Sequence, residues 1–415
     1  MHMEKPTLSL KERDRRWELA REFMRENGLE CLIAAPGNTY YSPDYFDAWF
    51  TNDNATGFAI LPLKSEPVYI VWAPMHCTLR MMENRKRGIE PWMDDYRVYT
   101  PAIQGIVDVL REKGLDAAAV GVVGLEQQGP GAIGGIAHGN WSNILKQLPD
   151  ADFSDVTRSF IELCRIKSEE ELALIRYACY VGDLACEEML KVVRPGVSET
   201  KIYAAIMGTI FENGANALHV ILQTGVENLS WGMPVWTYQA QEPPVVGKGD
   251  MVQAELFQLY GGVEAQQQMS VATKPVAPLT RELADVARRS YEIGINTMRP
   301  GVTFGEVVDA MEKPVLDAGG WYEMPLIHTM SPHGGINSGT AVGIEQAPEL
   351  KGLGFKDSPM NPAVRDLVLK PSMIFEVQPN ICRDHRRVNI GGTVIVTEDG
   401  VEELNKPASE MRVVE

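Results

Sequence analysis

The stretch 254-AELFQLYGGVEAQQQ-268 has the pattern of a β-hairpin that turns at Tyr260-Gly261-Gly262. Its two strands carry two Glu and four Gln among apolar residues. Burying carboxylates and amides in such a hairpin is costly unless those groups have partners. The stretch therefore predicts a hairpin that is built around a metal ion, a substrate or a network of hydrogen bonds.

Alternation along the strands decides which of these side chains share a face. The first strand puts one set of residues on the same face: Gln253, Glu255, Phe257 and Leu259. After the turn, the second strand does the same for Glu264, Gln266 and Gln268. Antiparallel pairing then opposes Glu255 to Gln266 or to Gln268. Either these groups satisfy one another, or they bind a polar substrate with Glu255 as acid, base or nucleophile.

Length and composition limit the class of protein. At 415 residues the chain exceeds one ordinary hydrophobic core, so two domains are expected. The net charge of −17 argues against nucleic acid and anionic membranes as partners and favours solubility, but it says nothing specific about the substrate, for which a small molecule is expected on other grounds. The sequence has neither an apolar run long enough for a membrane span nor a secretory signal. Six cysteines without paired spacing fit a reducing compartment, so a cytoplasmic location is expected.

The first part of the chain alternates predicted strands and helices. Ser9 and Glu12 form a capping-box pattern that opens a helix, and Asn27-Gly28 ends it near Glu26. Apolar strands at 31–35, 58–63, 68–73 and 118–124 follow, with a helical stretch at 103–114. This order predicts a small α/β domain at residues 1–164.

The second part of the chain, residues 165–415, contains a short internal sequence repeat. A long amphipathic helix begins near residue 168, and 194-RPGVSETKIYAAI-206 resembles 299-RPGVTFGEVVDAM-311. Each copy places a Ser or Thr, a natural N-cap, before a helix. The repeat predicts a pseudo-twofold domain in which helices pack on a sheet and the site lies at the symmetry axis.

Four segments resemble the creatinase/prolidase/methionine aminopeptidase family. They are 165-RIKSEEELALIRYA-178, 249-GDMVQAELFQLYGG-262, 373-MIFEVQPN-380 and 391-GGTVIVTEDGVEELN-405. The resemblance implies an α+β pita-bread catalytic domain, preceded by a smaller α/β creatinase-like N-terminal domain. It also implies a homodimer.

Metal-dependent members of that family bind two ions through two Asp, one His and two Glu. The positions that match these ligands hold Glu255, Gln266, His328 or His333, Gln378 and Gly391. One of the four carboxylate ligands is therefore retained. A dinuclear site needs carboxylates to offset and bridge the cations, so we expect no metal cofactor.

The same comparison supplies the other candidate residues. Trp231 stands where the family carries a His before the Gly-Asp turn, and we expect it to wall the pocket; His219 lies too far upstream to match. Glu376 alternates with Gln378 and either faces the pocket or lies at a solvated edge. The expected catalytic residues are Glu255, His328, His333 and Glu345, with Gln346 as an alternative to Glu345. The expected substrate-binding residues are Trp231, Glu264, Gln266, Gln268, Glu376 and Gln378.

These residues favour a metal-independent hydrolase, similar in style to creatinase or ectoine hydrolase. It would cleave a C–N bond in a small cationic, zwitterionic or aromatic metabolite. Three alternatives stay open: a lyase, a metal-dependent Xaa-Pro aminopeptidase or prolidase, and a catalytically inactive binding protein.

Overall fold

A computed structural model describes residues 3–36, 46–53, 57–76, 78–125, 135–330, 335–347, 350 and 352–415, without the side chains of His76, Thr78, Leu218 and Lys406. Two compact units are present within these residues. The N-terminal unit runs from Thr7 to Arg165. The C-terminal unit comprises Ile166–Met330 and Gly335–Glu415, together with the first residues up to Pro6.

The described part of the N-terminal unit contains a six-stranded sheet in the order β4-β3-β2-β1-β5-β6. Its strands are β1 (Cys31–Ala34), β2 (Phe58–Pro62), β3 (Val68–Val71), β4 (Asp95–Val98), β5 (Ala119–Val123) and β6 (Asp152–Asp155). Strand β2 runs antiparallel to β1 and β3, whereas β1–β5, β5–β6 and β3–β4 are parallel pairs. Strands β1 to β3 are buried along their whole length, as in sheets that helices cover on both faces.

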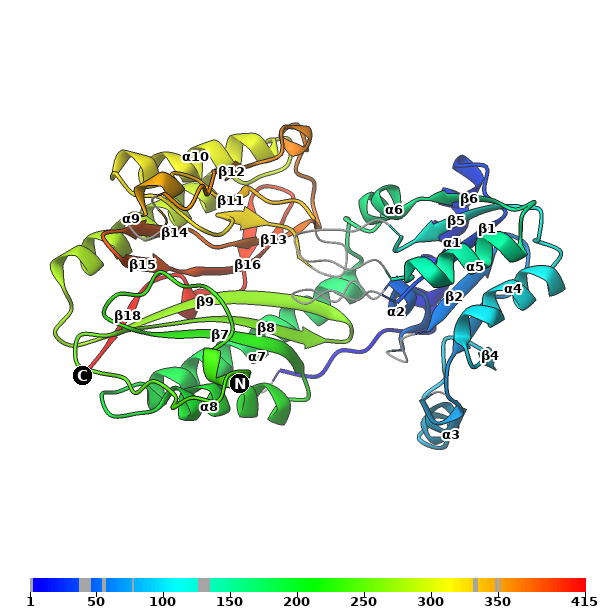
Figure 1. The fold of residues 1–415 in the computed structure, drawn as a ribbon, viewed down its shortest axis with the longest axis horizontal. Coiled ribbons are helices and arrows are strands. Elements are labelled where there is room, and N and C mark those ends of the chain that lie inside the picture. Colours follow the sequence, from blue (N-terminus) through cyan, green and yellow to red (C-terminus); the bar gives the residue numbers. More distant parts are fainter. Residues whose placement is uncertain are drawn as a thin grey trace. The chain divides into compact units, whose positions relative to one another are not determined.

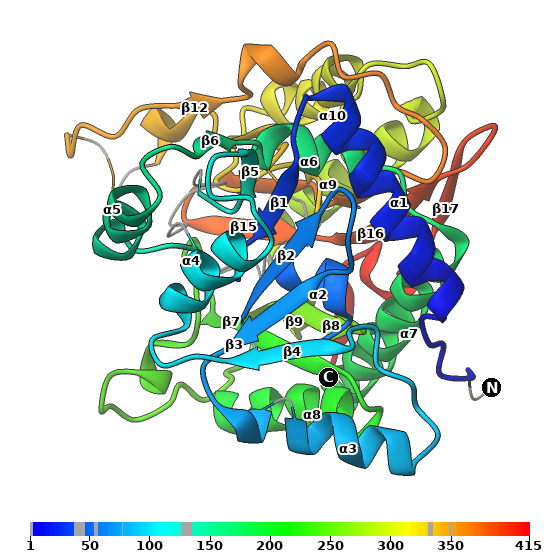
Figure 2. The same cartoon turned by 90° about the vertical axis from the view of Figure 1, so that its right-hand side faces the viewer.

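Two groups of helices cover this sheet. The helices of the unit are α1 (Leu10–Glu26), α2 (Phe46–Thr51), α3 (Thr78–Lys86), α4 (Ala102–Glu112), α5 (His138–Gln147) and α6 (Thr157–Leu163), with the 3-10 turn η1 (Pro74–His76). One hydrophobic core joins the sheet to α1, α2 and α6, and a second joins it to α4 and α5. Figure 2 shows α1 and α4 on opposite sides of strands β1 to β4.

The ends of helix α1 can be compared with the capping residues that the sequence predicts. The Ser9 side chain accepts a hydrogen bond from the Glu12 amide, and Asn27 is the C-cap, as predicted. The Glu12 carboxylate binds Arg15 and Arg16, each with a 2.8 Å contact, instead of closing a capping box with Ser9. The predicted helix is therefore confirmed, with half of the predicted cap.

The C-terminal unit is built on an eight-stranded sheet within the described residues, with the main order β10-β13-β16-β9-β8-β7. Strand β17 adds to β16, and β18 adds to β9. Its main strands are β7 (Asn216–Gly225), β8 (Met251–Tyr260), β9 (Val263–Thr273), β10 (Ile327–His328), β13 (Ile374–Val377), β16 (Gly391–Val396), β17 (Val401–Glu403) and β18 (Arg412–Val414). Two further strand pairs are β11 (Gly339–Ala341) with β12 (Ser358–Pro359), and β14 (Asn380–Arg383) with β15 (Arg386–Asn389).

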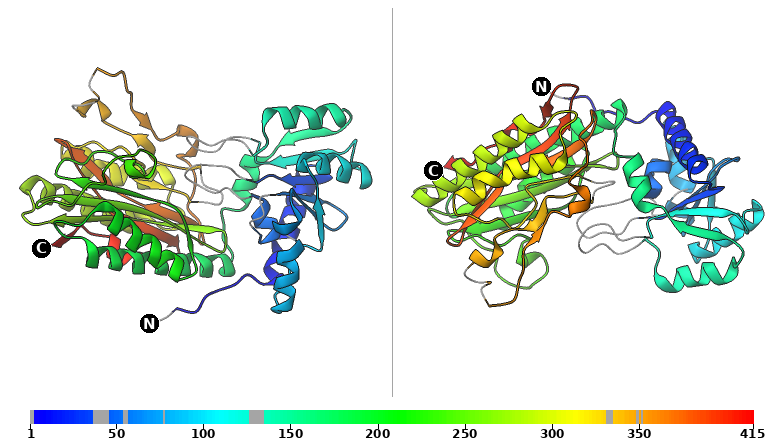
Figure 3. Two further views of the ribbon diagram at one scale, coloured as in Figure 1. Left: turned by 60° about the horizontal axis from the view of Figure 1, so that its bottom comes forward. Right: turned by 90° about the horizontal axis from the view of Figure 1, so that it is seen from above.

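Two helix pairs pack on this sheet. They are α7 (Glu169–Val192) with α8 (Glu199–Glu212), and α9 (Pro278–Thr297) with α10 (Phe304–Asp317). Figure 1 shows the first pair along the green half of the unit and the second along its yellow half, and Figure 3 shows α9 and α10 side by side. Short 3-10 turns are η2 (Val235–Thr237), η3 (Ile344–Gln346), η4 (Pro362–Val364) and η5 (Lys406–Ala408). Among the described helices, none is long and apolar enough to cross a bilayer.

The repeated turn predicted from the sequence is present. Ser198 caps α8 and Thr303 caps α10, each by accepting a hydrogen bond from a backbone amide in the first turn. At Thr303 the Glu306 carboxylate completes a capping box, and Ser168 with Glu171 does the same at the start of α7.

The helix pairs fix which face of the sheet carries the polar residues. Val252, Ala254 and Leu256 of β8 belong to the hydrophobic core under α7 and α8. Because side chains alternate along a strand, Gln253, Glu255 and Phe257 point to the opposite face. The helix-covered face and the polar face are therefore set by the same ten residues of β8.

Helix α7 comes unusually close to the sheet at Gly182. A Cβ atom at that position would lie 2.1 Å from Oε1 of Gln267 and 2.4 Å from Nε2 of Gln258. Oε1 of Gln267 accepts hydrogen bonds from Gln258, at 3.0 Å, and from Asn405, at 2.7 Å. This buried amide cluster joins α7 to β8, β9 and the segment after β17.

Gly182→Ala should destabilise the protein by about 1–3 kcal/mol, because the new methyl group displaces a hydrogen-bonded amide in a packed interior. Urea denaturation followed by circular dichroism measures the change. Gly208→Ala is the matched control, since a Cβ atom at Gly208 on α8 meets nothing within 4 Å. That variant should be as stable as the original protein or up to about 1 kcal/mol more stable. Equal stability of the two variants would contradict the close packing at Gly182.

Candidate active site

The register of β8 and β9 decides which amide faces Glu255. Glu255 pairs with Gln268, Phe257 pairs with Gln266, and Leu259 pairs with Glu264. Of the two pairings that the sequence left open, Gln268 is therefore the partner of Glu255. Paired residues in neighbouring strands point to the same face, so these side chains all lie on the face opposite the helices.

Three more strands extend this polar face. Gly391 on β16 pairs with Gln268, and Glu376 on β13 pairs with Thr393 on β16. His328 on β10 pairs in turn with Glu376. Chain segments that are more than a hundred residues apart in sequence thus contribute to one surface of the sheet.

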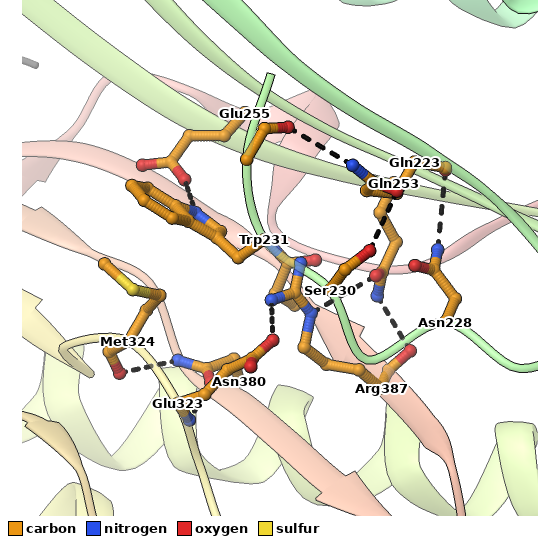
Figure 4. A network of polar contacts seen from close by, with 12 residues as sticks. Gln223, Asn228, Ser230, Trp231, Gln253, Glu255, Glu323, Met324, Asn380 and Arg387 are labelled. Atoms are coloured by element: carbon orange, nitrogen blue, oxygen red, sulfur yellow. Dashed lines mark hydrogen bonds and ion pairs between the residues drawn. The ribbon is translucent and has the colours of Figure 1, made fainter. Parts of the chain in front are cut away.

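Glu255 is enclosed, with 3% of its surface exposed. The indole Nε1–H of Trp231 donates a hydrogen bond to its Oε2 atom (Figure 4). Burial raises the pKa of Glu255 to about 7, and this rise is opposed by hydrogen bonds from Trp231 and Gln268 and by the charge of Arg387. Near neutral pH, Glu255 can therefore either hold a proton or accept one.

A buried cation lies next to Glu255. Arg387 on β15 is 3% exposed and forms an ion pair with Glu323. Its Nε–H donates to Oε1 of Gln253 at 3.2 Å, and Nε2 of Gln253 donates to the Arg387 carbonyl at 2.7 Å. Sequence reasoning missed Arg387 and Glu323. The available signal for Arg387 was a pair of consecutive arginines, Arg386 and Arg387, between the apolar residues Ile381 and Cys382 on one side and Val388 and Ile390 on the other.

Amide groups surround the Glu255–Gln268 pair. Nε2 of Gln268 donates to Oε1 of Gln378, and Nδ2 of Asn389 donates to Oε1 of Gln268. Asn389 is held in turn by Ser270, whose hydroxyl donates to the Asn389 carbonyl at 2.7 Å. Gln268 and Gln378, both predicted from the sequence, therefore lie together, while Asn389 was not predicted.

A second acidic group lies along the same face. Glu264 and Glu376 each have 0% of their surface exposed. Nε2 of Gln266 donates to Oε1 of Glu264 at 2.9 Å, and Oγ1 of Thr393 lies 3.4 Å from Oε2 of Glu376. Burial, followed by the charges of Glu255 and Glu264, raises the pKa of Glu376 well above its ordinary value.

The segment that carries Trp231 is tied to the end of β7. The Ser230 hydroxyl donates to Oε1 of Gln223 at 2.8 Å, and Nε2 of Gln223 donates to the Gly232 carbonyl at 3.3 Å. The amide of Asn228 also donates to the Gln223 carbonyl at 3.4 Å. Figure 4 shows Ser230 between Trp231 and Gln223. These hydrogen bonds to Gln223 fix the segment from which the Trp231 indole reaches Glu255.

The remaining candidates are placed differently. His328 is half-buried, its Nδ1 atom lies 2.8 Å from the Thr329 carbonyl, and burial lowers its pKa. Glu345 lies exposed on η3, and its place in the site stays a prediction. His333 lies outside the described residues. His219 is buried against Phe257, with 4.4 Å between the ring centroids, and burial lowers its pKa to about 4.

The side chains present do not fit a dinuclear metal centre. Amides occupy the positions of Gln266 and Gln378, and they are neutral and partly bonded to other side chains. At Gly391, with φ +130°, a Cβ atom would lie 1.8 Å from the Val377 carbonyl oxygen. No side chain of any length can therefore extend from this backbone position. Within the described residues, no three His, Cys, Asp or Glu side chains gather as a metal-binding group.

Comparison with known proteins places this geometry in context. The sequence profile of metallopeptidase family M24 matches residues 173–398. An Xaa-Pro dipeptidase from Lactobacillus delbrueckii is 24% identical over 289 residues, which cover 68% of this chain and 71% of that protein. An ectoine hydrolase from Halomonas elongata is 23% identical over 425 residues, which cover 94% of each chain.

Solved structures extend the likeness to the fold. An X-Pro aminopeptidase from Thermotoga maritima has a TM-score of 0.71 at 15% identity, covering 96% of this chain and 99% of that chain. A prolidase from Thermococcus sibiricus has a TM-score of 0.72 at 15% identity, covering 98% and 100%. The predicted α+β pita-bread fold is confirmed by these matches.

The raised pKa of Glu255 predicts how its replacement changes stability. The pKa is near 4.5 in the unfolded chain and about 7 in the folded one, so stability is lost as the pH rises between these values. Glu255→Gln removes this loss. The variant should gain about 3 kcal/mol relative to the original protein at pH 8, and much less at pH 5. Urea unfolding at both pH values measures this. If the difference in unfolding free energy between the variant and the original protein were the same at pH 5 and pH 8, the raised pKa of Glu255 would be contradicted.

Proposed function

The chain belongs to metallopeptidase family M24, a family of hydrolases, and on that premise we propose that it cleaves a C–N bond in a small nitrogenous metabolite without a metal ion. The observation that carries this proposal is Glu255. Glu255 is a buried carboxyl group with a pKa of about 7, and it accepts hydrogen bonds from the indole of Trp231 and the amide of Gln268. Its position in the sequence matches a metal-ligand position of the family.

Glu255 can serve both proton transfers of such a hydrolysis. As a carboxylate it accepts a proton from water while the water oxygen attacks the carbon of the C–N bond. As a carboxylic acid it then donates that proton to the departing nitrogen, which leaves as an amine. A pKa near the working pH suits a group that must act in both directions.

The neighbouring amides suit the orientation of a polar substrate. Gln268, Gln378 and Asn389 offer hydrogen-bond donors and acceptors on one face, and Trp231 presents an aromatic wall beside Glu255. An indole face favours cationic or aromatic groups. These features support a small cationic, zwitterionic or aromatic substrate, and we assign Glu255 the catalytic role.

Metal independence is part of the proposal because of the donor set. Three of the four carboxylate positions hold Gln266, Gln378 and Gly391, and the first two offer amide groups. Neutral amides cannot offset the charge of two divalent ions at close range. A hydrolysis that depends on a carboxyl and amides is consistent with the side chains present.

The first test is a substrate panel assayed with and without a chelator. The panel contains cyclic amidines such as ectoine, guanidino acids, simple amides and an Xaa-Pro dipeptide. We expect turnover of a non-peptide member that EDTA leaves unchanged, in protein whose metal content is well below one ion per chain. Xaa-Pro cleavage that requires added Mn²⁺ would overturn the proposal and favour a prolidase.

The second test follows the pH dependence of turnover. Because the carboxylate of Glu255 predominates only above about pH 7, kcat/KM should fall below that pH. Glu255→Gln should lower kcat by about 10²-fold or more at every pH. Glu292→Gln on α9, with Glu292 exposed at the surface, is the matched control and should behave as the original protein. Unchanged turnover in Glu255→Gln would remove Glu255 from the chemistry.

A catalytically inactive binding protein is the second candidate. The bonds among Gln268, Gln378 and Asn389, with Trp231 over Glu255, favour it because these groups already satisfy one another. Binding of a panel member without turnover would support this reading.

We further propose that the protein is a homodimer in a reducing, cytoplasmic environment. Five cysteines within the described residues are free and buried, which supports a reducing compartment. Light scattering coupled to gel filtration would test the dimer.

A further inference from the structure

Two buried oxygen atoms near Glu255 have no role in the proton transfers described above. They belong to Glu376 on β13 and Gln266 on β9, which lie on either side of Thr393 on β16. Thr393 pairs with Glu376, and its hydroxyl exchanges hydrogen bonds with the Gln266 backbone at 2.9 and 3.1 Å. Glu376 is 0% exposed and Gln266 is 4% exposed.

The orientation of the Gln266 amide is fixed by its neighbour. Nε2 of Gln266 donates to the Glu264 carboxylate at 2.9 Å, and only the nitrogen end of an amide can do so. Oε1 of the Gln266 side chain therefore takes no part in the contact with Glu264. It is buried and has no hydrogen-bond partner in the described part of the chain. A buried acceptor of this kind costs free energy until a donor reaches it.

Glu376 presents a matching acceptor. The Thr393 hydroxyl reaches Oε2, whereas Oε1 is buried and, among the described residues, has no hydrogen-bond partner. The charged groups that act on Glu376 are Glu255 and Glu264, both acidic. The nearby cation, Arg387, is already paired with Glu323. This face of the sheet therefore has more carboxyl groups than cations.

From these contacts we propose that Glu376 and Gln266 bind a cationic nitrogen with at least two N–H donors, as in a primary ammonium or a guanidinium group. The inference rests on the proposed function, since it names the charged part of the substrate. Two acceptors require two donors, which a quaternary ammonium lacks. The strands of Glu376 and Gln266 are about 10 Å apart, so the two side chains can converge on a small head group.

Burial and the charges of Glu255 and Glu264 raise the pKa of Glu376, which favours its protonated form when no cation is bound. The titratable groups that face Glu376 or interact with it electrostatically are Glu255, Glu264, His328, Cys179 and Tyr291. The ammonium replaces the proton as the counter-charge of the carboxylate. Binding should therefore release about one proton and should strengthen as the pH rises.

Calorimetric titration tests this without any turnover. The probes are methylammonium and methylguanidinium, with tetramethylammonium as the control cation, at constant ionic strength and in two buffers of different ionisation enthalpy. We expect at least one of the first two to bind with proton release, and tetramethylammonium not to bind. Glu376→Gln and Gln266→Met should each weaken binding by about tenfold or more. Glu292→Gln is the control and should bind as the original protein does.

Several outcomes would overturn the proposal. These are no detectable binding of either probe, equal binding of tetramethylammonium, and displacement of the probes by one equivalent of Mn²⁺. Unchanged binding in a folded Glu376→Gln would do the same. Circular dichroism checks folding, and if Glu376→Gln does not fold, Gln266→Met decides the question. Cation binding without hydrolysis of any panel member would retain this site and overturn only the proposed function.

Discussion

The burial of Glu255 opposite Gln268 is the constraint on which the polar half of this unit depends. A carboxyl that is taken out of water needs hydrogen-bond partners. Its partners come from β9, from the segment of Trp231 and, through Gln268, from Gln378 and Asn389. The apolar residues on the other side of β8 keep it there. A slip of one residue in β8 would drive Glu255 into the core under α7 and set Leu256 among the amides.

The electrostatic consequence is a site with several carboxyl groups and few cations. Glu323 is neutralised by Arg387, whose charge also favours the ionised form of Glu255. Glu376 receives no such help, because its charged neighbours are acidic. Burial thus raises the pKa of both carboxyl groups, to about 7 for Glu255, where Arg387 opposes the rise, and well above the ordinary value for Glu376, where the neighbouring charges add to it. Such a separation of pKa values is how neighbouring carboxyl groups acquire different roles.

Local patterns in the sequence predicted much of this architecture. The hairpin of β8 and β9 follows from alternation around a Gly-Gly turn, and the caps at Ser198 and Thr303 follow from short-range hydrogen bonding. What could not be predicted depends on strand pairing between distant segments. Arg387 meets Gln253 across 134 residues, and no periodicity in either strand encodes that contact.

In the candidate site, too, some residues could be predicted from local sequence patterns and others depend on the pairing of distant strands. Gln268 was predicted because it shares a strand face with Glu264 and Gln266. Gln378 was predicted because its position matches a metal ligand of the family that the sequence resembles. Asn389 and Glu323 became visible only once the strands were paired. Glu345 was named from the same family resemblance, and it lies exposed on η3, so its role stays a prediction.

The backbone at Gly391 has an evolutionary consequence. With the Val377 carbonyl oxygen in the space that a Cβ atom would need, the position admits no side chain at all. An acidic residue, which the family resemblance implies for metal-dependent members at this position, would require β13 and β16 to move apart. A substitution that placed a carboxylate here would have to be accompanied by a change in strand geometry, which makes such a substitution hard to acquire. The polar face can therefore vary more easily through the side chains of Gln268 and Gln378 than through this position.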